Sequence, residues 1–191
     1  MNKQTVIINL LGAPGTGKTT TAMEIFVEMK KVGLSVEFLS EFAKEALYED
    51  REKVFENELY MFAKKQHKMF VLDGQVDYVV TDAPLILTKV FNQYYNPNSN
   101  IALNNLIDEE HNKFLNINIL LDSDLNYKQE GRRESEEEAK ELHLLIAEEM
   151  VNLSGTNLTY KPKDQTILDM SMDDLVDFIV IESIKMRKKL D

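Results

Sequence analysis

The chain of 191 residues is long enough for one domain with a sizeable core, and its 43% hydrophobic and 29% charged residues form an ordinary globular balance. It contains no cysteine, which excludes a disulfide framework and a metal site built on thiolates. The formal net charge of −11 argues against a general nucleic-acid binder, although an acidic enzyme can still hold a polyanionic nucleotide in a local positive field. No apolar run approaches the roughly 20 residues that cross a bilayer, and the N-terminus shows no targeting pattern. We therefore expect a cytoplasmic protein with one domain over 1–191 and no membrane partner.

Strands and helices alternate along the chain. A short apolar run at Thr5–Leu11, rich in β-branched residues and ended by Gly12, predicts a buried strand. Apolar residues at helical spacing, with Gly33 as the stop, then predict a helix after Lys18. The remaining pattern predicts further strands at 35–41, 77–82, 116–122 and 156–160, and further helices at about 42–73, at 85–95, at 133–153 and from Ser171 toward the end of the chain.

This alternation is typical of a three-layer α/β fold, in which helices cover both faces of a parallel five-stranded sheet. In such sheets, ligands bind beyond the carboxyl ends of the strands. The segment 12–19, Glu41 and Asp82 each follow or end a predicted strand. We therefore expect these three polar features, which are distant in sequence, to meet at one edge of the sheet.

Other residues are expected to have structural roles. The spacing of Phe55, Leu59, Phe62 and Met69 predicts an apolar stripe on the later part of the second helical segment. The three histidines lack the spacing of metal ligands, so structural or surface positions are expected for His67, His111 and His143.

The segment GAPGTGKT at 12–19 matches the phosphate-binding pattern G-x-x-x-x-G-K-[ST]. Its glycines let backbone N–H groups point inward around phosphate oxygens, and the N-terminus of the following helix adds a favourable dipole. Lys18 is expected to bridge the β- and γ-phosphates of ATP, and Thr19 to ligate Mg²⁺. The alternative, a glycine turn with a chance lysine, is disfavoured by the flanking strand and helix. The expected nucleotide-binding residues are Gly12, Ala13, Pro14, Gly15, Thr16, Gly17, Lys18, Thr19 and Thr20.

Asp82 stands at the end of the apolar strand 77–82. A carboxylate in this place can hold Mg²⁺ through water beside a phosphate loop, so Asp82 is a candidate catalytic and metal-binding residue together with Thr19. The structural alternative is an aspartate that begins the turn before Pro84, which is a common position for this residue type.

Three further residues are candidates for catalysis. Glu41, just past the second strand, is placed to orient or deprotonate an attacking hydroxyl. Alternatively, it is an ordinary acid in the first turn of a helix capped by Ser40. Arg132 and Arg133 fall in a segment at about 124–135 that suits a closing lid, where two arginines would neutralise transition-state charge. Alternatively, they are surface arginines paired with nearby glutamates, and such pairs contribute little.

Four motifs together carry a resemblance to a known group. The sequence GAPGTGKTT, a strand running into SEFAKE, the strand end VVTDAP and the late segment YKQEGRR resemble the P-loop nucleoside and nucleotide kinases. More narrowly, they are similar to the ribosylnicotinamide-kinase-like ATP-binding domains often found in bacteriophages. The resemblance covers nearly the whole chain. It implies a P-loop kinase fold with strand order 2-3-1-4-5, ATP as the donor, Mg²⁺ as the cofactor and a lid bearing arginines.

The same resemblance implies roles for the candidate residues. Lys18 and Thr19 would bind phosphate and metal, and Asp82 would serve the metal. Glu41 would act on the acceptor, and Arg132 with its neighbour Arg133 would form the lid. Bifunctional members of this group carry a separate adenylyltransferase domain, for which this chain has no length, so a full role in cofactor synthesis is not expected.

The sequence thus predicts a kinase that moves the γ-phosphate of ATP to a hydroxyl or phosphate of a nucleoside, nucleotide or ribosyl compound, with a small molecule as its partner. Two alternatives remain open. A phage kinase acting on 5-hydroxymethylpyrimidine in DNA needs a groove for the strand, which the net charge disfavours. A regulatory nucleotide-binding ATPase needs no acceptor. The acceptor's identity and the oligomeric state stay open, with a homodimer among the possibilities.

Overall fold

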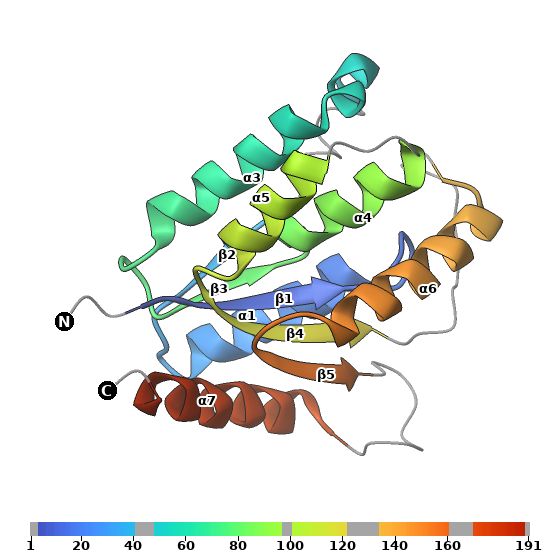
Figure 1. Ribbon diagram of the computed structural model, residues 1–191. Helices are drawn as coiled ribbons and strands as arrows, with labels where there is room; N and C mark the ends of the chain where they lie inside the picture. The colour runs from blue at the N-terminus through green and yellow to red at the C-terminus, as the bar shows by residue number, and fades with distance from the viewer. Residues whose placement is uncertain (1–3, 41–47, 97–100, 122–133, 161–169, 190–191) are drawn as a thin grey trace.

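The computed structural model describes residues 4–40, 48–96, 101–121, 134–160 and 170–189. Five parallel strands form one sheet of order β2-β3-β1-β4-β5, with helices on both faces (Figure 1). The strands are β1 Val6–Leu11, β2 Val36–Leu39, β3 Tyr78–Thr81, β4 Leu115–Leu121 and β5 Thr156–Tyr160. The helices are α1 Lys18–Lys31, the 3₁₀ helix η1 Glu52–Glu56, α3 Glu58–Leu72, α4 Leu85–Tyr95, α5 Ile101–His111, α6 Glu136–Val151 and α7 Met172–Lys188. None of the helices in the described ranges combines the length and the apolar character that crossing a membrane demands.

The predicted fold class and strand order are confirmed, and the central strand shows why the sheet forms. Every residue of β1 is buried, as expected for a strand covered on both faces. Val6 and Ile8 belong to the apolar core shared with α1 and α7. Ile7 and Leu11 point the other way, into the core shared with α3, α4, α5 and α6. The two layers meet the sheet on opposite faces (Figure 1), and Gly12 leaves β1 at its carboxyl end.

Helix boundaries follow local signals in the sequence. Gly33 has φ of +82° just after the last turn of α1, which confirms the predicted stop. The hydroxyl of Ser171 caps α7 by accepting a hydrogen bond from the backbone N–H of Asp174. The carboxylate of Asp174 in turn accepts a hydrogen bond from the backbone N–H of Ser171. The predicted stripe on α3 is wrong at Leu59, which is 58% exposed. The helix turns a different face to the core, and its buried residues are Met61, Phe62, Lys65 and Met69.

A row of asparagines, buried on β1 and β4 and exposed on β5, crosses the sheet on the face covered by α3 to α6. The Nδ2 of Asn9 on β1 donates to the side-chain oxygens of Asn118 at 2.9 Å and Asn116 at 3.0 Å, both on β4. The Nδ2 of Asn118 donates in turn to the Oδ1 of Asn157 on β5 at 2.9 Å. Asn9 is the register partner of Asn118, and Asn118 is that of Asn157. The amides therefore satisfy one another only when the three strands are aligned in this way.

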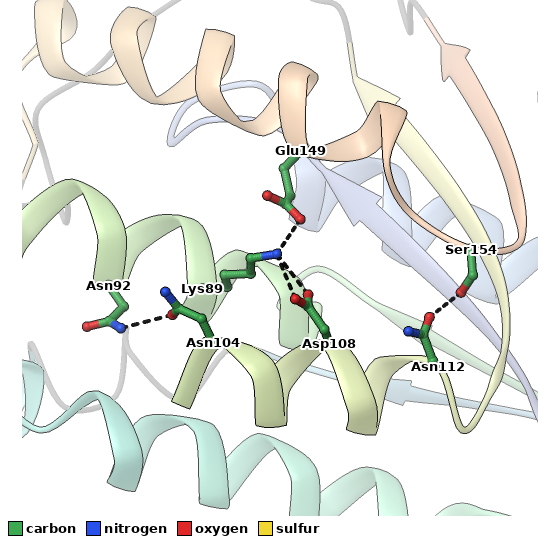
Figure 2. A network of polar contacts seen from close by, with 7 residues as sticks. All are labelled: Lys89, Asn92, Asn104, Asp108, Asn112, Glu149 and Ser154. Carbon is green, nitrogen blue, oxygen red and sulfur yellow. Dashed lines mark hydrogen bonds and ion pairs between the residues drawn. The ribbon is translucent and has the colours of Figure 1, made fainter. Parts of the chain in front are cut away.

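A buried lysine joins three helices on the same side of the sheet (Figure 2). The Nζ of Lys89 on α4 donates to both carboxylate oxygens of Asp108 on α5 at 2.9 Å and to Glu149 on α6 at 2.7 Å. Burial alone would lower the pKa of Lys89, but its hydrogen bonds with Glu149 and Asp108 outweigh this effect and raise the pKa. Nearby, Asn92 donates to Asn104 at 3.1 Å and links α4 to α5 again. These contacts fix the helices that flank the phosphate-loop edge of the sheet.

Candidate functional site

Three glycines shape the loop between β1 and α1. Gly12, Gly15 and Gly17 have φ of +141°, +97° and +89°, a region that side-chain-bearing residues rarely adopt. A Cβ at Gly12 would lie 2.7 Å from the Oγ1 of Thr16. That hydroxyl is buried and donates to the carbonyl of Ala13 at 2.9 Å. The loop therefore closes on itself through Thr16, and it has room for this closure only with a glycine at position 12.

Lys18 places a positive charge inside this loop. It is the first residue of α1, and its Nζ donates to the carbonyl oxygens of Gly12 at 2.8 Å and Ala13 at 2.9 Å. The first turn of α1 contains no acidic residue, so the positive end of the helix dipole is not offset there. The ammonium group and the helix N-terminus together form an environment that favours the oxygens of a phosphate.

Thr19 and Asp82 come together at the mouth of the loop. The Oγ1 of Thr19 donates to the Oδ2 of Asp82 at 2.6 Å. Asp82 directly follows β3 and is only 3% exposed. Within the described part of the chain, the other carboxylate oxygen of Asp82 is buried and accepts no hydrogen bond. A buried oxygen without a partner is costly, which favours a ligand that uses it.

This pair fits a magnesium ion. Mg²⁺ prefers hard oxygen ligands and is usually bound through one or two carboxylates, water and the phosphates of the substrate. Thr19 supplies a hydroxyl and Asp82 supplies a carboxylate with one oxygen still unused. Both residues were nominated as metal ligands from the sequence, and the structure brings them into contact.

A pocket lies beside this pair, between α3 and the carboxyl ends of β2 and β3. Its floor is stiffened by Thr81, whose hydroxyl donates to the carbonyl of Leu39 at 3.0 Å and accepts from the N–H of Ala83 at 3.1 Å. Lys65 is 8% exposed, and its Nζ donates to the Oγ1 of Thr88 on α4 at 3.3 Å. The residues that line the pocket are Leu39, Ser40, Lys64, Lys65, Lys68, Met69, Thr81 and Ala83.

The sequence interpretation did not assign the α3 lysines to a small-molecule site. The available signal was the pair Lys64 and Lys68, one helical turn apart with Lys65 between them. This pattern indicates a basic helix face, but only the fold shows that the face overlooks the ends of two strands.

The remaining predicted catalytic residues lie outside the described ranges. This applies to Glu41, Arg132 and Arg133, and to most of the expected lid segment. Glu134, which follows the arginines, accepts a hydrogen bond from the hydroxyl of Tyr95 at 2.9 Å. Of the predicted nucleotide-binding residues that the structure describes, Thr20 is exposed on α1, while Ala13 is buried. The structure thus brings together the phosphate loop, Thr19 and Asp82.

A family model described as an AAA domain, AAA_28, matches residues 7–160 of the chain. This match spans the sheet from β1 to β5 and includes the phosphate loop and Asp82. No curated protein matches the chain.

Several solved structures have a similar fold. A thymidylate kinase from Ehrlichia chaffeensis is 17% identical with a TM-score of 0.56, and the alignment covers 94% of this chain and 98% of that one. The NadR protein in complex with NR is 16% identical with a TM-score of 0.66; this chain is covered to 94% and spans about half of that protein, 52%. A deoxyadenosine kinase from M. mycoides is 19% identical with a TM-score of 0.54, and the alignment covers 91% of this chain and 96% of that one. The resemblance to P-loop nucleoside and nucleotide kinases is confirmed at the level of the fold.

Proposed function

The chain belongs to the AAA_28 family of AAA domains, and on that premise we propose that it is an ATP- and Mg²⁺-dependent phosphotransferase. Its acceptor is proposed to be a nucleoside, a nucleotide or a related ribosyl compound. The observation that carries the proposal is the 2.6 Å hydrogen bond between Thr19 and Asp82. It joins a phosphate loop to a buried carboxylate that has one oxygen free to bind further, which is the donor half of a phosphoryl-transfer site.

Each described residue of the site has a distinct proposed role. Backbone N–H groups of the loop would hold the phosphate oxygens of ATP, and Lys18 would exchange its two carbonyl contacts for the β- and γ-phosphates. Thr19 and Asp82 would hold Mg²⁺, which supplies positive charge that offsets the charge developing on the transferred group. Glu41 is proposed to orient the acceptor, and Arg132 with Arg133 to stabilise the transition state, as the resemblance implies.

A phosphate loop alone does not distinguish a kinase from an ATPase. The support for an acceptor is the pocket between α3 and the ends of β2 and β3. It adjoins Asp82 through Ala83 and opens at the same edge of the sheet as the phosphate loop. Phosphoryl transfer requires the donor and acceptor to be held side by side and in line, because positioning accounts for much of the catalysis. Two adjacent sites at one sheet edge meet this requirement.

Transfer of label from γ-labelled ATP to a panel of nucleosides, nucleotides and ribosyl compounds tests the proposal. We expect labelled product with at least one acceptor, and a loss of roughly 100-fold or more in Lys18→Met. Lys31→Met, at the far end of α1 and 64% exposed, is the matched control and should be unchanged. Brisk ATP hydrolysis with no labelled acceptor would instead support a regulatory ATPase, and label confined to hydroxymethylated DNA would support the DNA kinase.

A further inference from the structure

The pocket beside Asp82 is basic in an acidic protein. Among the described residues that line it, the charged ones are lysines of α3, whereas the whole chain has a formal net charge of −11. The described residues enclose about 260 Å³, counting the part that opens to solvent. The pocket is therefore an open hollow at the sheet edge rather than an enclosed cavity.

The positions of these lysines are unfavourable for a helix that only covers a sheet. Lys64 and Lys68 are one turn apart, and like charges at this spacing weaken a helix by a few tenths of a kcal/mol. Lys65 is 8% exposed, and burying an ammonium group costs free energy through lost hydration. The other buried residues of the same helix are apolar. An anion bound in the pocket would attract all three charges.

We propose that the acceptor carries its own phosphate group and that Lys64, Lys65 and Lys68 select it, so that the substrate class is a free nucleoside monophosphate rather than a nucleoside. This inference rests on the proposed function and narrows it. The fold relatives do not decide the matter, since they include both a thymidylate kinase and a deoxyadenosine kinase. The lysines of this chain favour the phosphorylated class.

The chemical step balances without a base. An oxygen of the acceptor phosphate attacks the γ-phosphorus of ATP and forms a P–O–P linkage. The bond from the γ-phosphorus to the β–γ bridging oxygen breaks, and its electron pair leaves with ADP. The attacking oxygen is already an anion, so no proton is released. The lysines would reduce the repulsion between the acceptor dianion and the γ-phosphate.

Matched acceptors test the proposal on the full chain. Initial rates are measured with ATP and Mg²⁺ for thymidine and dTMP, adenosine and AMP, and cytidine and CMP. We expect kcat/KM for at least one monophosphate to exceed that of its nucleoside by about 10- to 100-fold, the range for hydrogen bonds to a charged group. Lys68→Gln should raise KM for that monophosphate about 10-fold and leave KM for ATP unchanged. Lys31→Gln, an exposed lysine on α1, serves as the control for a change of net charge.

The outcomes separate this inference from the proposed function. Nucleosides phosphorylated as well as their monophosphates would overturn the inference and leave the function intact. A monophosphate could bind in calorimetry without ATP, and lose that binding in Lys68→Gln, yet accept no phosphate from ATP. This result would overturn the proposed function and leave the anion site. Absence of both binding and transfer would overturn both. An oligodeoxynucleotide that displaces the monophosphate at equal phosphate concentration would overturn the choice of a free mononucleotide.

Discussion

The hydroxyl of Thr19 donates a 2.6 Å hydrogen bond to the carboxylate of Asp82, although the two residues are 63 positions apart in the chain. Thr19 follows β1 through the phosphate loop, and Asp82 follows β3 directly. These two strands are neighbours in the parallel sheet, with Asn9 opposite Thr81. Parallel strands deliver their carboxyl ends to the same edge, so the loop after β1 and the residue after β3 converge there. The site therefore depends on the order of the strands as much as on the motif.

Replacing Asp82 with asparagine should separate metal binding from folding. The amide oxygen of Asp82→Asn can still accept the hydrogen bond from Thr19, so we expect a folded protein with little change in melting temperature. The loss of the negative charge should raise the Mg²⁺ concentration needed for half-maximal activity and lower kcat/KM by roughly 100-fold. Magnesium titrations of activity beside thermal melts measure both effects. An unchanged magnesium requirement would remove Asp82 from the metal site.

Gly12 and Gly33 form a matched pair for testing the shape of the loop. Both have positive φ, but a Cβ at Gly12 meets Thr16 at 2.7 Å, whereas at Gly33 it meets nothing within 4 Å. Gly33→Ala should cost only the strain of the left-handed conformation, about 1–2 kcal/mol, and leave ATP affinity intact. Gly12→Ala should cost more and weaken ATP binding by at least about 10-fold, because the loop must open. Calorimetric titration with ATP checks this, and equal affinities in the two variants would contradict it.

His111 should make the protein less stable as the pH falls. Burial lowers the pKa of His111 to about 4. The carboxylate of Asp108 opposes this shift, and the charge of Lys89 adds to it. An unfolded histidine has a pKa near 6.5. Between these values the unfolded chain binds a proton that the folded chain does not. The free energy of unfolding should therefore decrease by up to about 1.4 kcal/mol per pH unit, or about 3 kcal/mol in all.

Urea denaturation between pH 7 and 4.5 measures this dependence. His111→Phe should flatten the curve, because the titrating group is gone and its buried Nε2 has no hydrogen-bond partner within the described residues. His67→Gln, on the exposed side of α3, is the matched control and should retain the slope of the wild type. Parallel curves for the wild type and His111→Phe would show that other groups cause the loss.

Lys89 should contribute far more to stability than an exposed lysine with an acidic partner. Its side chain is 13% exposed, and Lys89→Met would leave Glu149, 17% exposed, without its counter-charge. We expect Lys89→Met to lower the free energy of unfolding by about 2–3 kcal/mol. This is the lower end of the range for a broken buried ion pair, because Asp108 stays partly hydrated. Lys140→Met, which removes an exposed pair with Glu136, should leave the free energy of unfolding almost unchanged. Denaturation curves compare the two variants, and equal losses would contradict the argument.

The sequence was sufficient to predict the sheet and the meeting of the phosphate loop with Asp82 at one of its edges. Apolar runs of β-branched residues mark the strands, and their alternation with helices sets the parallel order. Asp82 could be nominated because it ends such a run, and the structure confirms its contact with Thr19. Local sequence patterns suffice to locate the strand end and the glycine loop, because each of them is formed by consecutive residues.

The pocket beside Asp82 could not be predicted in the same way. Leu39, Lys65 and Thr81 come from three elements, and only the packing of α3 over the strand ends makes them neighbours. The contact of Lys89 with Asp108 and Glu149 likewise joins three helices across 60 positions of sequence. Leu59 shows the reverse case, in which a periodic pattern assigned an exposed residue to the core. Tertiary packing decides which face of a helix is buried.

The row of asparagines across β1, β4 and β5 has a consequence for how reliably the sheet assembles. Sliding β1 by two residues against β4 would keep every apolar side chain on its own face, so hydrophobic burial alone tolerates that error. In the direction that sets Asn9 opposite Leu120, however, the slide would end the direct pairing of Asn9 with Asn118 and place its buried amide beside an apolar side chain. It would also shift Gly12 by roughly 7 Å along the sheet, more than the reach of a hydrogen bond. The pairing of Asn9 with Asn118 thus disfavours this misaligned sheet, in which the phosphate loop would be out of place.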